Sequence, residues 1–590
     1  MNETEETTLT HHAMLVAWGQ FAHCMGLIRA LMQVVLKQKT VVHKPQTKVL
    51  EFFVSILAGF QYLKDISYSE HPLDKDETVA RAWGQAQWAD HSGVSRTLHS
   101  LSAAEVAALH GMLEEVEAPL LEKEIVLSNA GGRLELDADL TPRPVSNTSE
   151  TYPEAEFGHM DDRICLGYQA AIVSLSSPTY GRLGLSAVQH PGNTVANTQA
   201  EALVLVAEQR LQGHPLRRTE LLKTRLEAHL AVQNQLHAKV DRSRESLERK
   251  QAQLQQVEAQ MAAAAATFQQ LQRTYTRQER PERPHSQLAQ ARHKLAMYQQ
   301  RWARGQKALD KAQTWHHKQL AHALTHRKAL DQLRTRLARF QQENAQNTVP
   351  LAMVIRLDAG FGTAENIALL IEMGYEVYTK PHGNWLAGEL RKRRKATCAW
   401  QKVGKNAEMV AWEQVQLDGC PYPLDLACER FWTGKAYRYS GLLHFGADPV
   451  CANLPGWFHF YNARQTIEAG NKELRQVFEV HHLKVRARPA LQLQEHFALF
   501  AANFVRYASL WLAAQCPQVP EGWKESTQPS VKQQVKVGAH TSAWVSWCGQ
   551  DCLLRFSDLS VFAGRSFEIK RSWAFQPVLP FLKNCFFAPT

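Results

Sequence analysis

The sequence predicts an α/β protein with a mixed sheet, interrupted by a long coiled-coil hairpin. Residues 351–380 show the order strand, turn, helix, strand, which is a βαβ unit and implies parallel strands. Between residues 215 and 345, apolar residues recur every seven positions, the pattern of a coiled coil. Since the chain has 590 residues and single cores stop growing at about 250–300 residues, we expect several domains.

We expect seven segments. They are a helical domain with a helix-turn-helix at 1–115, core segments at 130–212, 349–382 and 456–515, the hairpin at 213–348, a β-rich insertion at 383–455 and a β-rich tail at 516–590.

The N-terminal segment is helical by its apolar spacing. In residues 80–101 we expect a short helix, a turn carrying Gly93, and a second helix that starts near Val94 with Ser92 as its cap. The side chains Ser95, Arg96 and Thr97 would then project from that second helix, as in a DNA-binding helix-turn-helix. An ordinary helical hairpin explains the segment equally well.

The strands of the predicted sheet come from both sides of the hairpin. Leu134–Leu140 alternates apolar and acidic residues, and Ala170–Ser176 and Arg182–Val188 are two further strands. Met353–Asp358 ends at a glycine-rich turn, a helix follows from Ala364 to Met373, and Tyr375–Thr379 is the next strand. The sheet is therefore split by the hairpin.

The hairpin itself has two arms of about sixty residues, which reach roughly 90 Å at 1.5 Å per residue. Pro281 and Pro284 mark the turn, because neither fits inside a helix. Its ends near His214 and Pro350 must lie close together if one domain surrounds it. Its outer face would either pair with a second subunit or lie along DNA.

Charge and composition limit the classes of protein to which this chain can belong. The net charge is +10, which favours polyanions such as nucleic acid. The acidic N-terminus lacks a secretory signal. The most apolar stretch, Phe497–Ala514, contains Arg506 and is too short for a membrane span. The ten cysteines are scattered, so we expect reduced thiols and no zinc site.

Three acidic residues stand at positions suited to chemistry. Asp139 and Asp358 end predicted strands, where active sites of α/β sheets gather. Glu468 lies on a predicted helix, on the same face as Arg464 and Lys472. Each acid alone is more typical of a turn, a cap or a surface ion pair. Together they can bind Mg²⁺, and two such ions support phosphodiester cleavage.

Three motifs connect these acids to a known family. Tyr461, Arg464 and Glu468 have the spacing Tyr-x2-Arg-x3-Glu, and Arg475 stands where the family has Lys. The run Leu357-Asp358-Ala359-Gly360-Phe361-Gly362 matches the second motif, and Asp139-Leu140-Thr141 matches the first. The sequence resembles the bacterial insertion-sequence transposases of the DDE class. Asp137 lies on the same strand face as Asp139, so either could be the first acid.

The resemblance implies an RNase H-like mixed-sheet catalytic core. It makes Asp139, Asp358 and Glu468 the catalytic and metal-binding residues for two Mg²⁺ ions, with Mn²⁺ as a substitute. DNA contacts would come from Tyr461, Arg464, Lys472 and Arg475, together with Ser95, Arg96 and Thr97 of the N-terminal domain.

The implied activity is cleavage at transposon ends and transfer of the 3′ ends into target DNA by a cut-and-paste reaction. The expected partners are double-stranded DNA, as terminal inverted repeats and target, and a second copy of the chain in an active homodimer. We expect a cytoplasmic, nucleoid-associated protein without a membrane. The alternatives are a catalytically silent DNA-binding protein derived from a transposase, and a coiled-coil scaffold.

Overall fold

The computed structural model describes residues 6–38, 42–160, 162–393, 399–448, 450–515, 529–556 and 566–569. The chain forms two compact units, one combining Met1–Leu216 with Asn347–Thr590 and the other Arg217–Gln346. In the first unit, Leu351 N donates to the carbonyl oxygen of His214 at 3.2 Å. The chain therefore leaves and re-enters this unit at neighbouring points, as the sequence predicted.

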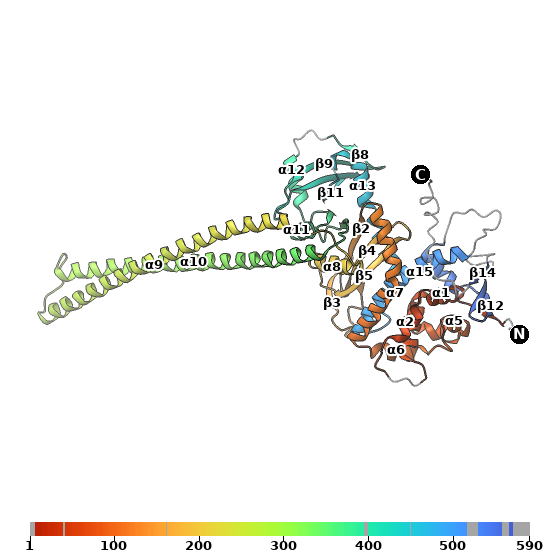
Figure 1. Cartoon of the computed structure of the whole chain (residues 1–590). Coiled ribbons are helices and arrows are strands. Elements are labelled where there is room, and N and C mark those ends of the chain that lie inside the picture. Colours follow the sequence, from red (N-terminus) through yellow and green to blue (C-terminus); the bar gives the residue numbers. More distant parts are fainter. Residues whose placement is uncertain are drawn as a thin grey trace. The chain divides into compact units, whose positions relative to one another are not determined.

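A mixed sheet forms the centre of the first unit (Figure 1). Its strands around the hairpin insertion are β2 (Leu134–Pro144), β3 (Glu156–Met160), β4 (Arg163–Ser177), β5 (Gly181–Pro191), β6 (Met353–Leu357) and β7 (Glu376–Thr379). β4 is antiparallel to β2, β3 and β5, whereas β2, β6 and β7 are parallel neighbours. The predicted strands and the βαβ unit, with helix α11 (Ala364–Glu372), are present. The expectation that Asp139 ends its strand was wrong, because β2 continues to Pro144.

The β-rich insertion extends this sheet. Its strands are β8 (Gln401–Lys402), β9 (Ala407–Val415), β10 (Leu424–Trp432) and β11 (Tyr437–Phe445), preceded by helix α12 (Trp385–Arg393). They are antiparallel, and β11 pairs with β7. The expected β-structure is present, and it shares a core with the rest of the sheet, because Tyr378 of β7 packs with Met409 and Trp457.

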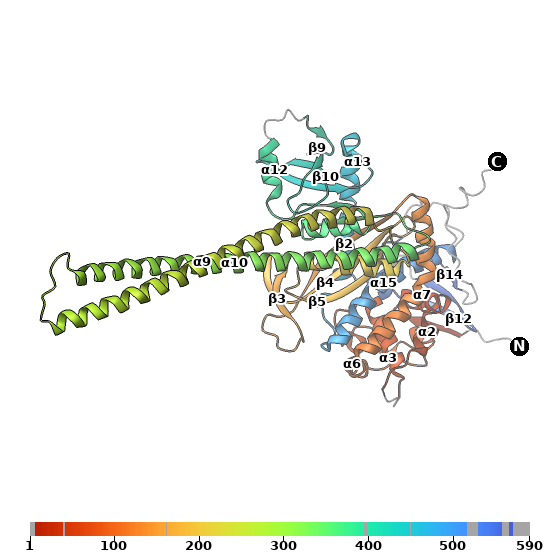
Figure 2. The ribbon, with the colours of Figure 1, turned by 60° about the vertical axis from the view of Figure 1, so that its left-hand side comes forward.

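Helices enclose a long central helix, α15 (Arg488–Gln515). The N-terminal ones are α1 (Ala13–Cys24), α2 (Leu27–Gln33), α3 (Pro45–Leu57), α4 (Asp65–Tyr68), α5 (Glu77–Ala82), α6 (His91–His99) and α7 (Ala103–Ala130). Aromatic rings pack against each other across this junction: the ring centroids of Phe53 and Phe497 are 5.4 Å apart, and those of Phe21 and Phe504 are 5.1 Å apart. Figure 2 shows α15 among α3, α6 and α7, so the N-terminal helices belong to the same compact unit as the sheet.

Helix α15 is longer than the sequence indicated. Within the described residues, Arg488–Ala514 is long and apolar enough to cross a membrane, and the bent pair α1 and α2 passes the same test when taken together. The prediction that this stretch is too short was wrong, because the helix begins nine residues before Phe497. However, 67% of its apolar window is buried inside the protein, as in the core helix of a soluble protein.

The two ends of the chain share a small sheet. Strand β1 (Glu6–Thr10) pairs with β12 (Ala543–Cys548), which continues to β13 (Asp551–Phe556) and β14 (Ser566–Ile569). Helix α16 (Val531–Lys536) precedes it. The described residues of the predicted β-rich tail include these three strands, and the reading of the N-terminal segment as helical missed β1.

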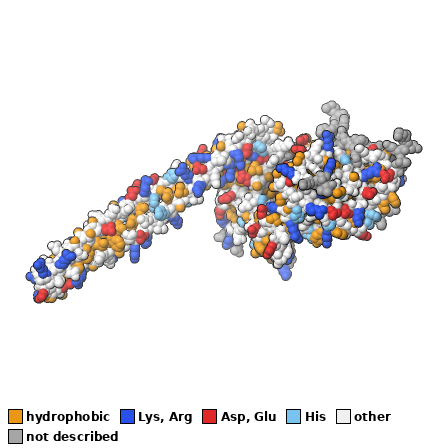
Figure 3. Space-filling view, turned by 90° about the horizontal axis from the view of Figure 1, so that it is seen from below, with side chains coloured by type: hydrophobic (Ala, Val, Ile, Leu, Met, Phe, Trp, Pro, Cys, Tyr) orange, Lys and Arg blue, Asp and Glu red, His pale blue; other side chains and the backbone are white. Residues whose placement is uncertain are grey.

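The second unit is an antiparallel helical hairpin of α9 (Thr219–Arg277) and α10 (Gln287–Gln346), seen in Figures 1 and 2. The helices have 59 and 60 residues, and Pro281 and Pro284 lie in the connection. The predicted arms and turn are confirmed. Hydrophobic side chains also appear on its surface (Figure 3), and Trp315 is 55% exposed.

The predicted helix-turn-helix needs correction. Helix α6 starts at His91, and its cap is Asp90, which accepts from Gly93 N at 2.8 Å; Ser92 and Gly93 lie inside the helix. The turn is the segment between α5 and α6 instead. Thr97 is 2% exposed and packs inward, so its predicted DNA contact is wrong, whereas Arg96 is exposed.

Candidate active site

Parallel pairing brings two of the predicted acids to neighbouring positions. In the register of β2 and β6, Asp137 stands opposite Arg356. The pairing ends there; Asp139 lies two residues further along β2, and Asp358 follows directly after the last residue of β6. The site is thus built at the carboxyl end of β6, where it adjoins the middle of the longer strand β2.

Asp139 is the better placed of the two candidate first acids. Its side chain is 16% exposed. Its Oδ2 accepts from Asn471 Nδ2 at 2.7 Å, and its Oδ1 lies 3.3 Å from Arg464 Nη2. Burial raises the pKa of Asp139 to about 6; Arg464 opposes this rise, while the charges of Asp358 and Glu468 add to it. The three predicted acids therefore share one electrostatic environment.

Asp137 has a different role. It is fully buried, and its carboxylate receives Arg356 Nε at 2.8 Å, Arg356 Nη2 at 2.9 Å and Arg182 Nη2 at 2.7 Å. Both oxygens are occupied by guanidinium groups that hold β2 to β6 and β5. The structure therefore favours Asp139 as the first acid, and Asp137 as the ion-paired support beneath it.

Asp358 begins the turn that follows β6. Its Oδ1 accepts from Gly360 N at 2.9 Å, and its carbonyl oxygen accepts from Thr379 Oγ1 at 3.1 Å. A side chain at Gly362 would collide with the carbonyl oxygen of Lys380. The glycine-rich run after Asp358 thus lets the turn pack against the end of β7, which fixes the direction of the Asp358 side chain.

The third motif spans two helices, α13 (Leu454–Asn462) and α14 (Gln465–Gln476). The sequence predicted one continuous helix here, which is wrong: a turn at Ala463 and Arg464 separates the two. Tyr461, on α13, is buried, and its hydroxyl donates to the carbonyl oxygen of Leu357 at 2.9 Å. Its predicted DNA contact is therefore replaced by a structural one, which anchors α13 to the end of β6.

Arg464 links the acids. Its Nη1 lies 3.4 Å from Glu468 Oε1, and its Nη2 is the atom near Asp139. The Arg464 side chain is 9% exposed, whereas that of Glu468 is 64% exposed. Arg464 Nε is buried without a hydrogen-bond partner among the described residues. Glu468 thus stands at the rim of the site and Arg464 lies between the carboxylates.

The remaining predicted contacts lie further along α14. Lys472 is exposed and Arg475 is half-buried. In the N-terminal helices, Arg96 is exposed and Ser95 is half-buried on α6. These four predicted DNA contacts therefore remain accessible to a ligand, whereas Thr97 and Tyr461 are buried.

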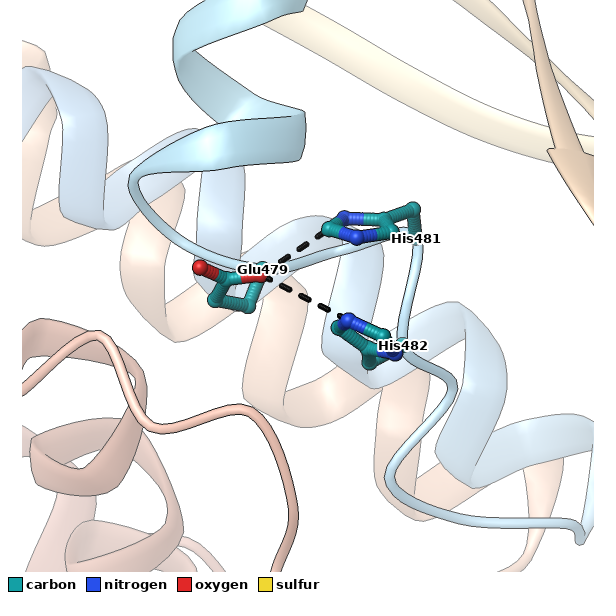
Figure 4. Close-up of side chains that lie close together, drawn as sticks. All are labelled: Glu479, His481 and His482. Atoms are coloured by element: carbon teal, nitrogen blue, oxygen red, sulfur yellow. Dashed lines mark ion pairs between the residues drawn. The ribbon is translucent and has the colours of Figure 1, made fainter.

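Sequence reasoning missed three groups of polar residues. Arg182 and Arg356 hold Asp137, and Asn471 holds Asp139. The position of Asn471, seven residues after Arg464, was the available signal, because it puts both on one helix face. The third group is Glu479, His481 and His482, in the loop after α14 (Figure 4).

No protein-family model matches this chain, and no curated protein matches it.

Proposed function

We propose that this protein is a metal-dependent DNA transposase of the DDE class with an RNase H-like core. One observation carries the proposal: the charge of Asp358, directly after β6, acts on Asp139 of the adjacent parallel strand β2, and Arg464 connects Asp139 to Glu468. The mixed sheet, split by the hairpin and reassembled in one unit, supports the same reading.

The side chains suit divalent metal ions. Asp139, Asp358 and Glu468 offer only oxygen ligands, which Mg²⁺ prefers. The pKa of Asp139 is raised by burial and by the two other carboxylates, so a cation among them would relieve an unfavourable charge. When bound, Mg²⁺ ions, or Mn²⁺ in their place, would supply Lewis-acid assistance to attack at phosphorus and to departure of the leaving oxygen, and Asp139, Asp358 and Glu468 would hold them.

The chain's own residues would position ligands and substrate. Asn471 fixes the Asp139 carboxylate, and Tyr461 fixes the end of β6 next to Asp358. Arg464 lies between Asp139 and Glu468, where its charge would attract a substrate phosphate towards the acids. The exposed cation Lys472, with Arg475 one turn on, would follow the DNA backbone.

The reaction would proceed in two displacements. Water would attack the phosphodiester at each transposon end, which releases a 3′-hydroxyl on the element and leaves a 5′-phosphate on the flanking DNA. That hydroxyl would then attack a target phosphodiester, joining the two strands as the 3′-oxygen of the target strand leaves. The partners would be double-stranded DNA, as terminal inverted repeats and target, and a second copy of the chain in a homodimer. Such an enzyme would work in the cytoplasm, at the nucleoid.

The test is nicking of DNA that carries the ends of the element, with Mg²⁺ and with EDTA. Asp358→Asn and Asp139→Asn should each abolish cleavage and keep DNA binding, because each removes one metal-binding charge at nearly constant volume. Asp331→Asn, on the exposed surface of α10, is the matched control and should cut normally. Cleavage by Asp358→Asn would refute the proposal, and binding without cutting by the unaltered protein would favour the catalytically silent alternative.

A further inference from the structure

A cluster of nitrogen and oxygen atoms lies apart from the three carboxylates, in the loop between α14 and α15. Glu479, His481 and His482 each present one ligand atom, and the three atoms lie within 4.8 Å of one another. Figure 4 shows the Glu479 carboxylate facing the two neighbouring imidazoles, with an ion pair to each. Glu479 is 6% exposed, and the histidines are half-buried.

The separations within this cluster suit a shared cation better than direct hydrogen bonds. Glu479 Oε2 lies 3.7 Å from His481 Nδ1 and 3.8 Å from His482 Nε2. Hydrogen bonds between such atoms are about 2.7–3.2 Å long. Ligands bound at 2.0–2.1 Å in a tetrahedral zinc site stand about 3.3 Å apart, so side-chain rotations would bring the carboxylate and one nitrogen of each ring onto one ion.

The surroundings hold the cluster in place. Glu479 lies between Phe478 and Val480, which are fully buried and fix the loop. Glu479 Oε1, the oxygen turned away from the histidines, receives Lys536 Nζ at 2.6 Å. Hydrogen-bonded supports of this kind orient metal-binding carboxylates.

Both histidines also have neighbours. His481 Nδ1 lies 2.6 Å from the carbonyl oxygen of Arg475, so a ring that keeps this bond would offer its other nitrogen to the ion. The ring of His482 lies 5.2 Å from that of Tyr62.

The donor set selects the class of metal. Two imidazoles and one carboxylate favour Zn²⁺ and related transition metals over Mg²⁺. Three protein ligands leave a fourth position for water. Lys536 and also Lys484, whose Nζ lies 3.3 Å from the Glu479 carbonyl oxygen, repel a cation, so the affinity would be lower than in a site without neighbouring cations.

We propose that Glu479, His481 and His482 form a binding site for Zn²⁺ or a similar transition metal, separate from the carboxylate site. Its effect would be structural. The Arg475 carbonyl belongs to the last turn of α14, and Lys536 also donates to the Gly59 carbonyl oxygen at 3.0 Å. A metal there would tie the end of the helix that carries Glu468 to the segment after α3 and to α16.

The test uses the full-length protein, stripped with EDTA and titrated with Zn²⁺ against a chromophoric chelator. We expect one equivalent that is lost, or weakened at least tenfold, in Glu479→Gln and in the double variant His481→Ala/His482→Ala. The matched control is His317→Ala/His322→Ala, which removes two exposed histidines of α10 and should keep the equivalent. Absence of Zn²⁺ binding, or an unchanged equivalent in the His481/His482 variant, would overturn the proposal.

Two further measurements separate this site from misfolding and from the carboxylates. Zn²⁺ should raise the melting temperature of the unaltered protein and leave that of Glu479→Gln unchanged, since only binding to the native state stabilises it. Asp358→Asn should retain the Zn²⁺ equivalent. If Asp358→Asn removes it, the ion belongs to the carboxylate site and the assignment here is wrong, whatever the outcome for DNA cleavage.

Discussion

The hairpin seam and the sheet beneath the candidate active site both bury polar side chains, but in different ways. In the seam, the uncharged side chains of Gln233 and Ser243 meet histidines: Gln233 Oε1 lies 2.9 Å from His326 Nδ1, and Ser243 Oγ lies 2.9 Å from His316 Nδ1. In the sheet, Asp137 meets the guanidinium groups of two buried arginines. A buried charge that loses its partner costs far more than a neutral group does. The same substitution should therefore matter much more in the sheet than in the seam.

The largest effect should come from Asp137→Ala. It leaves Arg182 and Arg356 buried without their shared carboxylate, and breaking a buried ion pair costs about 3–5 kcal/mol. Urea denaturation of the purified protein should show this loss in the first unit. A loss below about 1 kcal/mol would mean that water reaches the two arginines, and that their contacts with Asp137 contribute no more than surface ion pairs do.

Asp139→Asn, in contrast, should raise the free energy of unfolding of the metal-free protein. Because the pKa of Asp139 is raised from 3.8 to about 6, the folded state holds its proton more tightly than the unfolded state. The ionised form therefore destabilises the fold, and the free energy of unfolding falls as pH rises from about 4 to 6 and then levels off.

Replacing Asp139 removes this penalty. The gain in the free energy of unfolding should approach about 3 kcal/mol at pH 7, since each pKa unit corresponds to 1.36 kcal/mol. The gain should vanish near pH 3.5, where the unaltered carboxyl is protonated. Denaturation at both pH values, in EDTA, measures it. An equal change in stability at the two pH values would show that the carboxylate is not the cause.

The hairpin seam should respond weakly. A double-mutant cycle of Gln233→Ala and His326→Ala should give a coupling energy of about 1 kcal/mol, the net value of a neutral hydrogen bond. Helix content followed by circular dichroism during thermal unfolding reports it. A coupling energy above about 3 kcal/mol would show that the seam depends on its polar contacts as strongly as the sheet depends on the ion pairs of Asp137.

The smallest effect on the first unit should come from replacing residues 217–346 with a short flexible linker. Asn347 Nδ2 donates to the His214 carbonyl oxygen at 2.8 Å, so the two ends are already held together without the hairpin. The melting temperature of the first unit should stay nearly unchanged. Mass in solution should fall to that of a monomer if the hairpin joins subunits; an unchanged oligomer would place the dimer contact elsewhere.

Much of this architecture was readable from local patterns. The hairpin was predicted within a few residues, because a heptad repeat and two prolines specify helices and turn without reference to distant residues. The βαβ unit was equally clear. The helix break at Ala463 and Arg464 could not be predicted, because Tyr461, Arg464 and Glu468 fit the spacing of one helix. Capping by Asp90 was missed because Ser92 is an equally good capping residue type.

The sequence by itself identified the three candidate acids and their motifs, since residue type and spacing act over a few positions. The choice between Asp137 and Asp139 depended on the tertiary structure. The two aspartates share a strand face, and the arginines that occupy Asp137 lie 45 and 219 positions away. Burial, ion pairing and the resulting pKa of Asp139 arise from atoms that only folding brings together, so no local pattern could distinguish the two.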